Sequence, residues 1–288
     1  MTVTETTPAV ALAAPTGGNR RVVAALVRRP TFVLSIAVLL FWAAAPLAVL
    51  ALGLDAYGQA GEPHQPPGAE HLLGTDDLGR DVFVRLLAGA GPILVVAPAA
   101  TLLASVLGAV LGLVAGYHGG IVDDLLMRSF DILNALPGIV AVLLVAAAFG
   151  RSPVTIVIAI AVFFTPLIAR TVRSAVLVET NKQYVEAART QGESTRRILL
   201  AEILPNVAPA LVVESTIRLG YAIFVSAGLS FLGLGARPPS ADWGLVVSQN
   251  RIFIQTSWWS IAFPALAIIS LVVAINLLAD NLREVLSR

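Results

Sequence analysis

Residues 31–54 read TFVLSIAVLLFWAAAPLAVLALGL, a run of 24 residues without a charged side chain. As a helix, this run is long enough to cross the hydrocarbon core of a bilayer, which is about 30 Å thick. It is too long for the apolar region of a signal peptide, and arginines at positions 20, 21, 28 and 29 precede it. We therefore predict that residues 31–54 form an uncleaved first transmembrane helix.

The composition of the whole chain also indicates a membrane protein. Of its 288 residues, 57% are hydrophobic and 13% are charged, and that charged share is about half the ~25% of soluble domains. Five further stretches are long and apolar enough to span a membrane: 92–116, 132–149, 153–169, 206–228 and 258–279. We expect an all-α membrane protein with six transmembrane helices.

Several classes of function are excluded by residue counts. The chain has no cysteine and three scattered histidines, so we expect no metal site and no cysteine nucleophile. Its single lysine, Lys182, has no glycine-rich approach, so the chain has no phosphate-binding loop and cannot hydrolyse ATP by itself. A net charge of +1 predicts no nucleic-acid partner.

The positions of the basic residues predict the orientation in the bilayer. If the amino terminus is cytoplasmic, thirteen basic residues lie in inner segments and five in outer ones, with Arg218 inside a span. Because inner segments are enriched in arginine and lysine, both termini are expected in the cytoplasm. Trp258 and Trp259 then lie at the outer membrane interface, where tryptophans are common.

The longest inner loop, residues 179–205, is predicted to form a compact helical unit below the membrane. YVEAARTQG at 184–192 contains good helix formers and ends in a glycine suited to a left-handed C-terminal position. Ser194 or Thr195 is expected to cap a second short helix. Pro205 marks the start of the next span, and the apolar side of the second helix is expected to pack on the bundle through Ile198, Leu199 and Ile203.

This loop resembles the coupling loop of importer-type ABC permeases, whose pattern is E-A-A, then glycine, then I-L-P. The resemblance implies that an ATPase subunit contacts Tyr184, Glu186, Ala187, Ala188, Gly192, Ile203, Leu204 and Pro205. The small alanines favour close approach by another protein surface. The alternative is an amphipathic helix that lies on lipid without a partner, although such a helix carries larger apolar residues at these positions.

Other segments resemble the oligopeptide and dipeptide importer family, specifically its C-type permease subunit. These segments are HLLGTDDLGRDVF at 71–83, GYHGG at 116–120, LSFLGLG at 229–235 and WG at 243–244. Two residues depart from the family pattern. Ser226 stands where an acidic residue is usual, and Glu202 stands where a basic residue or histidine is usual.

The resemblance implies a function and a set of partners. We expect a non-catalytic permease in the bacterial cytoplasmic membrane that imports di- or oligopeptides, with nickel chelates, glutathione or similar solutes as the alternative cargo. The implied partners are a second, different permease, two ATP-binding subunits that hold ATP and magnesium, and an extracytoplasmic substrate-binding protein. The chain divides into a disordered tail (1–19), a basic segment with the first span and the start of an outer loop (20–70), and a permease core with five spans (71–288).

Two groups of charged residues have both a functional and a structural interpretation. Glu214 and Arg218, four residues apart inside a span, either form a latch within the helix bundle or line the translocation path together with Ser226. The spacing favours the latch. In the outer segment, either the charges dock an external partner or Thr75 or Asp76 caps an interfacial helix; the charges concerned are Asp76, Asp77, Arg80 and Asp81.

Several glycines are expected at the ends of helices or in the turns between them. Gly116, Gly119 and Gly120 are predicted turn residues, with Asp123 as the cap of the third helix. The glycines at 228, 233 and 235 either end the fifth span or open a polar path.

An ion-coupled secondary transporter is disfavoured because no internal repeat is visible. An intramembrane enzyme is disfavoured because the spans carry no paired catalytic groups.

Overall fold

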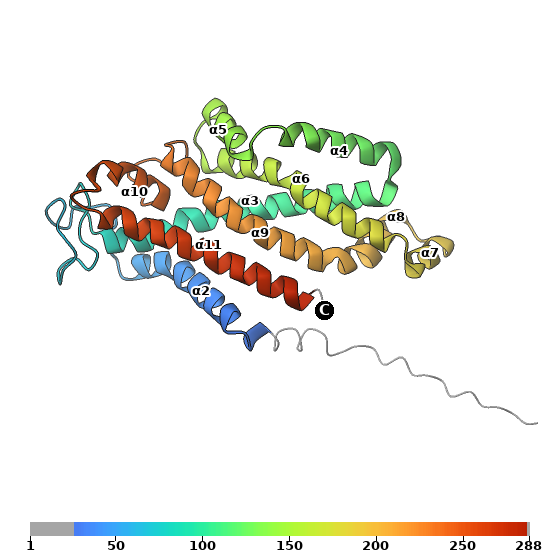
Figure 1. Cartoon of the computed structure of the whole chain (residues 1–288), viewed down its shortest axis with the longest axis horizontal. Coiled ribbons are helices and arrows are strands. Elements are labelled where there is room, and N and C mark those ends of the chain that lie inside the picture. Colours follow the sequence, from blue (N-terminus) through green and yellow to red (C-terminus); the bar gives the residue numbers. More distant parts are fainter. Residues whose placement is uncertain (1–25, 287–288) are drawn as a thin grey trace, which may run out of the picture.

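The structure, a computed structural model, describes residues 26–286 as a bundle of long helices (Figure 1). The tail predicted for residues 1–19 lies outside this range. Five helices are long and apolar enough to cross a membrane, and the count is six if a bent helix pair is taken as one span. The expected all-α membrane architecture is confirmed. The five are α2 (Pro30–Ala51), α3 (Val82–His118), α6 (Pro153–Glu179), α9 (Leu204–Phe231) and α11 (Trp259–Leu286).

Helices α3 and α6 form the closest pair in the bundle. Glycines on α3 recur every four residues at positions 108, 112 and 116. A Cβ atom at each of them would lie 2.8, 2.7 and 2.8 Å from the side chains of Ile168, Val172 and Val176, respectively. Small residues at this spacing let two membrane helices approach until their backbones are almost in contact. Gly116 is therefore a packing residue, contrary to its predicted role in a turn, whereas Gly119 and Gly120 have the positive φ angles of turn residues.

The third span is broken inside the predicted range 132–149. Helix α4 (Gly120–Asn134) and helix α5 (Gly138–Phe149) meet at an angle of 80°. Pro137 lies at the break, in extended backbone with φ −55° and ψ 122°, because proline lacks an amide hydrogen and disfavours helix at the preceding residue. The prediction that Asp123 caps this span is wrong. Gly119 occupies the cap position of α4, and the Asp123 carboxylate pairs with Arg173 of α6.

The second span begins earlier than predicted. Helix α3 starts at Val82 and has 37 residues, which corresponds to about 55 Å. The predicted interfacial helix is therefore the first part of α3 and not a separate helix. The cap is Asp81, whose carboxylate accepts a hydrogen bond from the Val84 amide at 3.1 Å. Thr75 and Asp76, the predicted caps, lie upstream in the loop between α2 and α3.

Two hydrophobic cores stabilise the bundle near its two ends. The first contains Trp42 and Trp243, whose ring centroids lie 4.7 Å apart in an edge-to-face arrangement. The second joins α6 to the loop predicted to be cytoplasmic, through Val176, Val185 and Ile203. In Figure 1, α7 (Gln183–Thr190) and α8 (Thr195–Arg197) lie at one end of the bundle, and α10 (Trp243–Asn250) lies at the other.

Candidate functional site

Helix α7 is the short helix expected in the loop between the fourth and fifth spans. It covers Gln183–Thr190, and Gly192 follows with φ +75°. No atom lies within 4 Å of a Cβ placed on Gly192, so only its backbone conformation requires glycine. The Gly192 amide donates to the Arg189 carbonyl at 3.0 Å, and the Glu193 amide donates to the Ala188 carbonyl at 3.1 Å. This pair of bonds ends the helix in the manner of a left-handed cap.

The two faces of α7 differ sharply in exposure. Val185 is fully buried and Ala188 is 8% exposed, and both belong to the second hydrophobic core. Glu186 and Ala187 are exposed. Of the two alanines in the E-A-A pattern, Ala188 therefore seats the helix against the bundle, and Ala187 presents a small outward surface beside the Glu186 carboxylate.

The second short helix of the loop is continuous with the fifth span, whereas the sequence predicted a separate helix. Helix α8 follows Ser194, whose side chain makes no capping bond, and it leads through the π-helix η1 (Ile198–Ile203) directly into α9. Pro205 has no amide hydrogen for the carbonyl four residues earlier, and a π-helical turn accommodates that loss. Ile198 and Ile203 are buried, as predicted, and Leu199 packs against the same core.

A network of polar side chains attaches α7 to the ends of α6 and α9. The Glu179 carboxylate accepts hydrogen bonds from Lys182 Nζ at 2.7 Å and from the Tyr184 hydroxyl at 2.6 Å. Asn206 Nδ2 of α9 donates to the Tyr184 oxygen at 3.3 Å. Burial, and then the hydrogen bond to Glu179, raise the pKa of Tyr184 to about 12. The hydroxyl therefore remains a donor throughout the physiological pH range.

One further contact holds α7 against α3. The guanidinium carbon of Arg189 lies 4.8 Å from the ring centroid of Tyr117 near the end of α3, a distance typical of a cation–π contact. The sequence-based reasoning missed Glu179 and Tyr117 as anchors of α7. In the sequence, only their positions indicated this role. Glu179 ends a span five residues before Tyr184, and Tyr117 lies beside the glycines that follow α3.

Glu214 and Arg218, the charged residues of the fifth span, form an ion pair with each other on α9. Arg218 Nε lies 2.6 Å from Glu214 Oε1, and the guanidinium is also 5.5 Å from the Tyr221 ring centroid. The side chains of Glu214 and Arg218 are 13% and 21% exposed. Glu214 lines a cavity of about 370 Å³ between α6, α9 and α11, where Arg283 is also found. Within residues 26–286, the ion pair of Glu214 and Arg218 joins no second helix.

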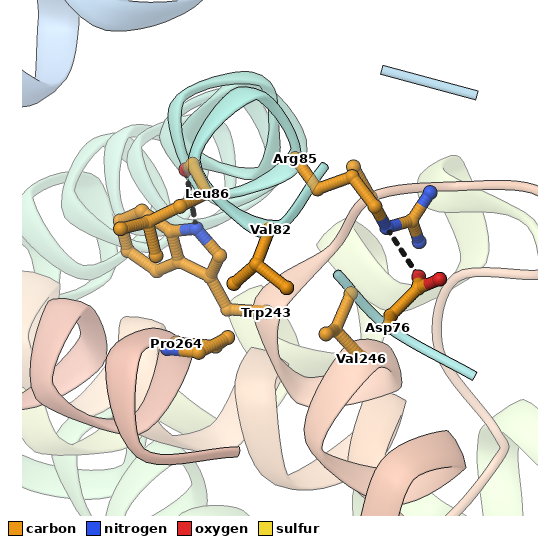
Figure 2. Close-up of a pocket in the computed structure, with 8 residues that line it drawn as sticks. Asp76, Val82, Arg85, Leu86, Trp243, Val246 and Pro264 are labelled. Atoms are coloured by element: carbon orange, nitrogen blue, oxygen red, sulfur yellow. Dashed lines mark hydrogen bonds and ion pairs between the residues drawn. The ribbon is translucent and has the colours of Figure 1, made fainter. Parts of the chain in front are cut away.

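The charges of the segment predicted to be outer are mostly buried. Asp76 is fully buried and Arg80 is 6% exposed, and their side chains pair at 2.7 Å. Arg85 lies beside them, with Nε 3.4 Å from Asp76 Oδ2 (Figure 2), and it donates to the Ala56 and Ser240 carbonyls at 2.9 and 3.2 Å. Arg85 therefore joins this loop to the segments of Ala56 and Ser240, and Asp76 and Arg80 are buried against each other.

The two remaining outer charges are less buried. The side chain of Asp77 is 24% exposed, and its Oδ1 atom lies 3.7 Å from Arg80. Asp81 caps α3, and its carboxylate also pairs with His71 Nδ1 at 2.9 Å. Figure 2 shows Trp243 in the same pocket as Asp76 and Arg85, with its indole nitrogen donating to the Leu86 carbonyl at 2.8 Å. Asp77 is the only one of the four predicted docking charges that neither caps α3 nor is buried in this cluster.

Ser226 lines a second cavity, at the α10 end of the bundle. The cavity has a volume of about 510 Å³ and is bounded by α3, α9 and the segments that precede α6 and α10. Ser226 is 5% exposed, and the same wall contains Asp242, which is 2% exposed. Helix α9 ends nearby at Phe231, and Gly233 follows with φ +77°. Gly233 therefore follows the end of the span, as one of the two interpretations of the glycines predicted, whereas Gly228 lies inside α9.

Comparisons with known proteins agree on one family. The family profile described as binding-protein-dependent transport system inner membrane component matches residues 108–288. A putative peptide transport system permease protein of Brucella suis biovar 1 is 39% identical over 269 residues, which cover 91% of this chain and 88% of that protein. The dipeptide transport system permease protein DppC of Alkalihalophilus pseudofirmus is 40% identical, over 77% of this chain and 73% of that protein.

Two further matches concern cargo and fold. A glutathione transport system permease protein, GsiD of Pectobacterium atrosepticum, is 38% identical over 88% of this chain and 84% of that protein. Among solved structures, a chain of the inward-facing MetNI methionine ABC transporter matches with a TM-score of 0.56. That match covers 71% of this chain and 97% of the other at 20% identity, and it supports the fold alone.

Proposed function

Because this chain belongs to the family of binding-protein-dependent transport system inner membrane components, we propose that it carries di- or oligopeptides across the membrane. It is a non-catalytic ABC permease subunit of the inner membrane. The proposed cargo rests on relatives named for peptide, dipeptide and glutathione transport. Glutathione is itself a small peptide. Glutathione and nickel chelates are the alternative cargo.

The observation that carries the proposal is the position of α7. The helix is anchored to α3, α6 and α9, while its Glu186 and Ala187 face remains exposed at the end of the bundle. We propose that two ATP-binding subunits, which hold ATP and magnesium, bind α7 here and its counterpart on a second permease. A rigid attachment to three helices would convert closure of the ATPases into a movement of the bundle.

The charges of α9 support a second permease as partner. Glu214 and Arg218 lie near the middle of an apolar helix and remain 13% and 21% exposed. Ionisable groups at such depth face protein or water and not lipid, because lipid cannot solvate them. A second, different permease that covers this face would place both groups and Ser226 beside a shared translocation path.

The same arrangement supports a proposal for the orientation in the membrane. We propose that α7 and both termini are cytoplasmic and that α10 and the outer loops face an extracytoplasmic solute-binding protein. Arg29 near the start of α2 and Glu284 near the end of α11 pair at 2.5 Å. The ends of the first and last helices therefore lie together, away from α10 (Figure 1). The excess of arginine in the inner segments supports this direction.

Deletion and complementation would test the cargo. In a host auxotrophic for one amino acid, deletion of this gene is expected to abolish growth on a dipeptide that supplies this amino acid. Growth on the free amino acid should be unchanged, and a plasmid copy should restore growth on the dipeptide. Undiminished uptake of labelled dipeptide and glutathione in the deletion strain would contradict the proposal.

A further inference from the structure

The cavity at the α10 end is lined by apolar side chains and by charged and hydroxyl side chains. Its apolar wall comes mainly from Pro92, Val95 and Val96 of α3 and from Ile156 of α6. Its polar lining consists of two arginines, one aspartate and three serines: Arg151, Arg237, Asp242, Ser226, Ser230 and Ser240. The volume of about 510 Å³ falls within the ~300–1,000 Å³ of small-ligand sites.

Asp242 is a buried carboxylate without a cation. It accepts hydrogen bonds from the Leu245 amide at 3.1 Å and from the Ser230 hydroxyl. Within the part of the chain that the structure describes, no basic side chain forms an ion pair with it. Burial accordingly raises the pKa of Asp242. A cationic ligand group would remove the cost of burying this charge alone.

Arg151 and Arg237 supply the opposite charge at the same cavity. Both are exposed, one just before α6 and the other in the segment after α9. Neither forms an ion pair with another described residue. Guanidinium groups bind carboxylates with two parallel hydrogen bonds, so these two side chains suit a carboxylate at the cavity mouth.

We propose that this cavity is a subsite at the outer mouth of the permease for a free peptide. Asp242 receives the α-ammonium group, Arg151 and Arg237 receive the terminal carboxylate, and the apolar wall accepts a side chain. The inference rests on the proposed function and deepens it, because it states that the permease itself recognises the two charged ends of its cargo.

Asp242 also caps α10, and this structural role can be separated from its charge. Asparagine is as good a helix cap as aspartate, so Asp242→Asn keeps the cap and removes the negative charge. A purely structural Asp242 would tolerate that change without any effect on ligand binding. Arg151→Gln and Arg237→Gln give the corresponding changes at the mouth of the cavity.

Cysteine protection tests the site directly, because the chain has no cysteine of its own. Ala236 lines the cavity and offers a small side chain for Ala236→Cys; Leu72, 63% exposed in the outer loop, gives the control Leu72→Cys. Membranes that contain the assembled transporter are treated with an impermeant thiol reagent. The probes are Ala-Ala, N-acetyl-Ala-Ala and Ala-Ala-amide, and the labelling rate of this subunit is measured.

Ala-Ala is expected to slow labelling of Ala236→Cys and not of Leu72→Cys. The protecting concentration should rise about tenfold for either blocked peptide, because each loses one charge-assisted interaction. In the Ala236→Cys background, Asp242→Asn should abolish the preference for a free amino end and leave the preference for a free carboxyl end. The arginine variants should show the reverse.

Three results would overturn the inference: no labelling of Ala236→Cys, equal protection by free and blocked peptides, or unchanged preferences in Asp242→Asn. Uptake of labelled Ala-Ala in the same cells separates this failure from that of the proposed function. Uptake without protection would reject the subsite and leave the importer. Absence of uptake in the wild type would reject both.

Discussion

The hydroxyl of Tyr184 donates a hydrogen bond of 2.6 Å to the Glu179 carboxylate, and this bond joins α7 to the end of α6. Tyr184→Phe keeps the ring and removes the bond to a charged acceptor. We expect a loss of about 1–2 kcal/mol in the local attachment of α7 and reduced peptide-stimulated ATPase activity of the reconstituted complex. Normal activity with normal assembly would show that this bond does not carry coupling. Tyr57→Phe, in the outer loop, serves as the control.

The same bond predicts how Tyr184 responds to pH. Its pKa is raised to about 12, from about 10 in an unfolded chain. Stability from the protonated hydroxyl is therefore fully present below about pH 10 and is lost as the pH rises through 12. The difference between the ultraviolet titrations of the wild type and Tyr184→Phe should show one tyrosine that ionises near pH 12. A midpoint near 10 would contradict the buried, bonded hydroxyl.

Gly192 offers a test of the cap of α7. Gly192→Val forces a β-branched residue into φ +75°, which should cost about 1–2 kcal/mol locally and displace the exposed face of α7. Membrane insertion should be normal, while peptide-stimulated ATPase activity should fall. Gly192→Asn is the matched control, because asparagine tolerates this conformation and should retain most of the activity. Wild-type activity in the valine variant would remove Gly192 from the coupling mechanism.

The spans and the short helix of the predicted coupling loop could be predicted from the sequence because both depend on local patterns. Apolar length determines a span, and the helix of 184–192 is defined by its formers and its terminal glycine. The start of α3 was missed because the charges of residues 76–85 suggested an aqueous loop. In the structure, Arg85 lies inside the helix with its Nε atom 3.4 Å from Asp76 Oδ2, a contact that local sequence does not show.

The cavity at the α10 end was beyond prediction for a different reason. Arg151, Ser226 and Asp242 come from three separate segments, and only the folded bundle brings them together. Asp242 lies outside the spans predicted from the sequence, and no local pattern marks it as part of a site. The bend at Pro137 was visible as a proline, but prolines also lie within α3, α6 and α11 without breaking them. Tertiary packing decides which of these prolines ends a helix.

The orientation of the bundle makes a prediction that needs only single cysteines. Glu186→Cys should resist an impermeant maleimide in intact cells and react after permeabilisation, because α7 is proposed to be cytoplasmic. Leu72→Cys should react in intact cells without permeabilisation, since Leu72 is 63% exposed in the outer loop. The opposite pattern in the two variants would invert the proposed topology and also place the peptide subsite on the wrong side.

The last prediction concerns Glu214 and Arg218, which form an ion pair with each other on α9. A latch between helices requires a bond to a second helix, and the pair makes none within residues 26–286. Glu214 instead lines a cavity of about 370 Å³, where water can solvate a charge that loses its partner. We therefore expect Glu214→Gln and Arg218→Gln to assemble with normal thermal stability in detergent and to change which peptides are carried.

The double variant separates the two roles. If the pair lines the path, combining Glu214→Gln with Arg218→Gln should not restore wild-type uptake, because the missing charges act on the cargo. If the pair is a latch, a single change leaves a buried charge alone and destabilises the complex by about 3–5 kcal/mol, whereas the double change recovers much of that loss. Assembly and uptake must be measured separately in all three variants. Loss of assembly in the single variants with recovery in the double variant would assign the pair to the latch.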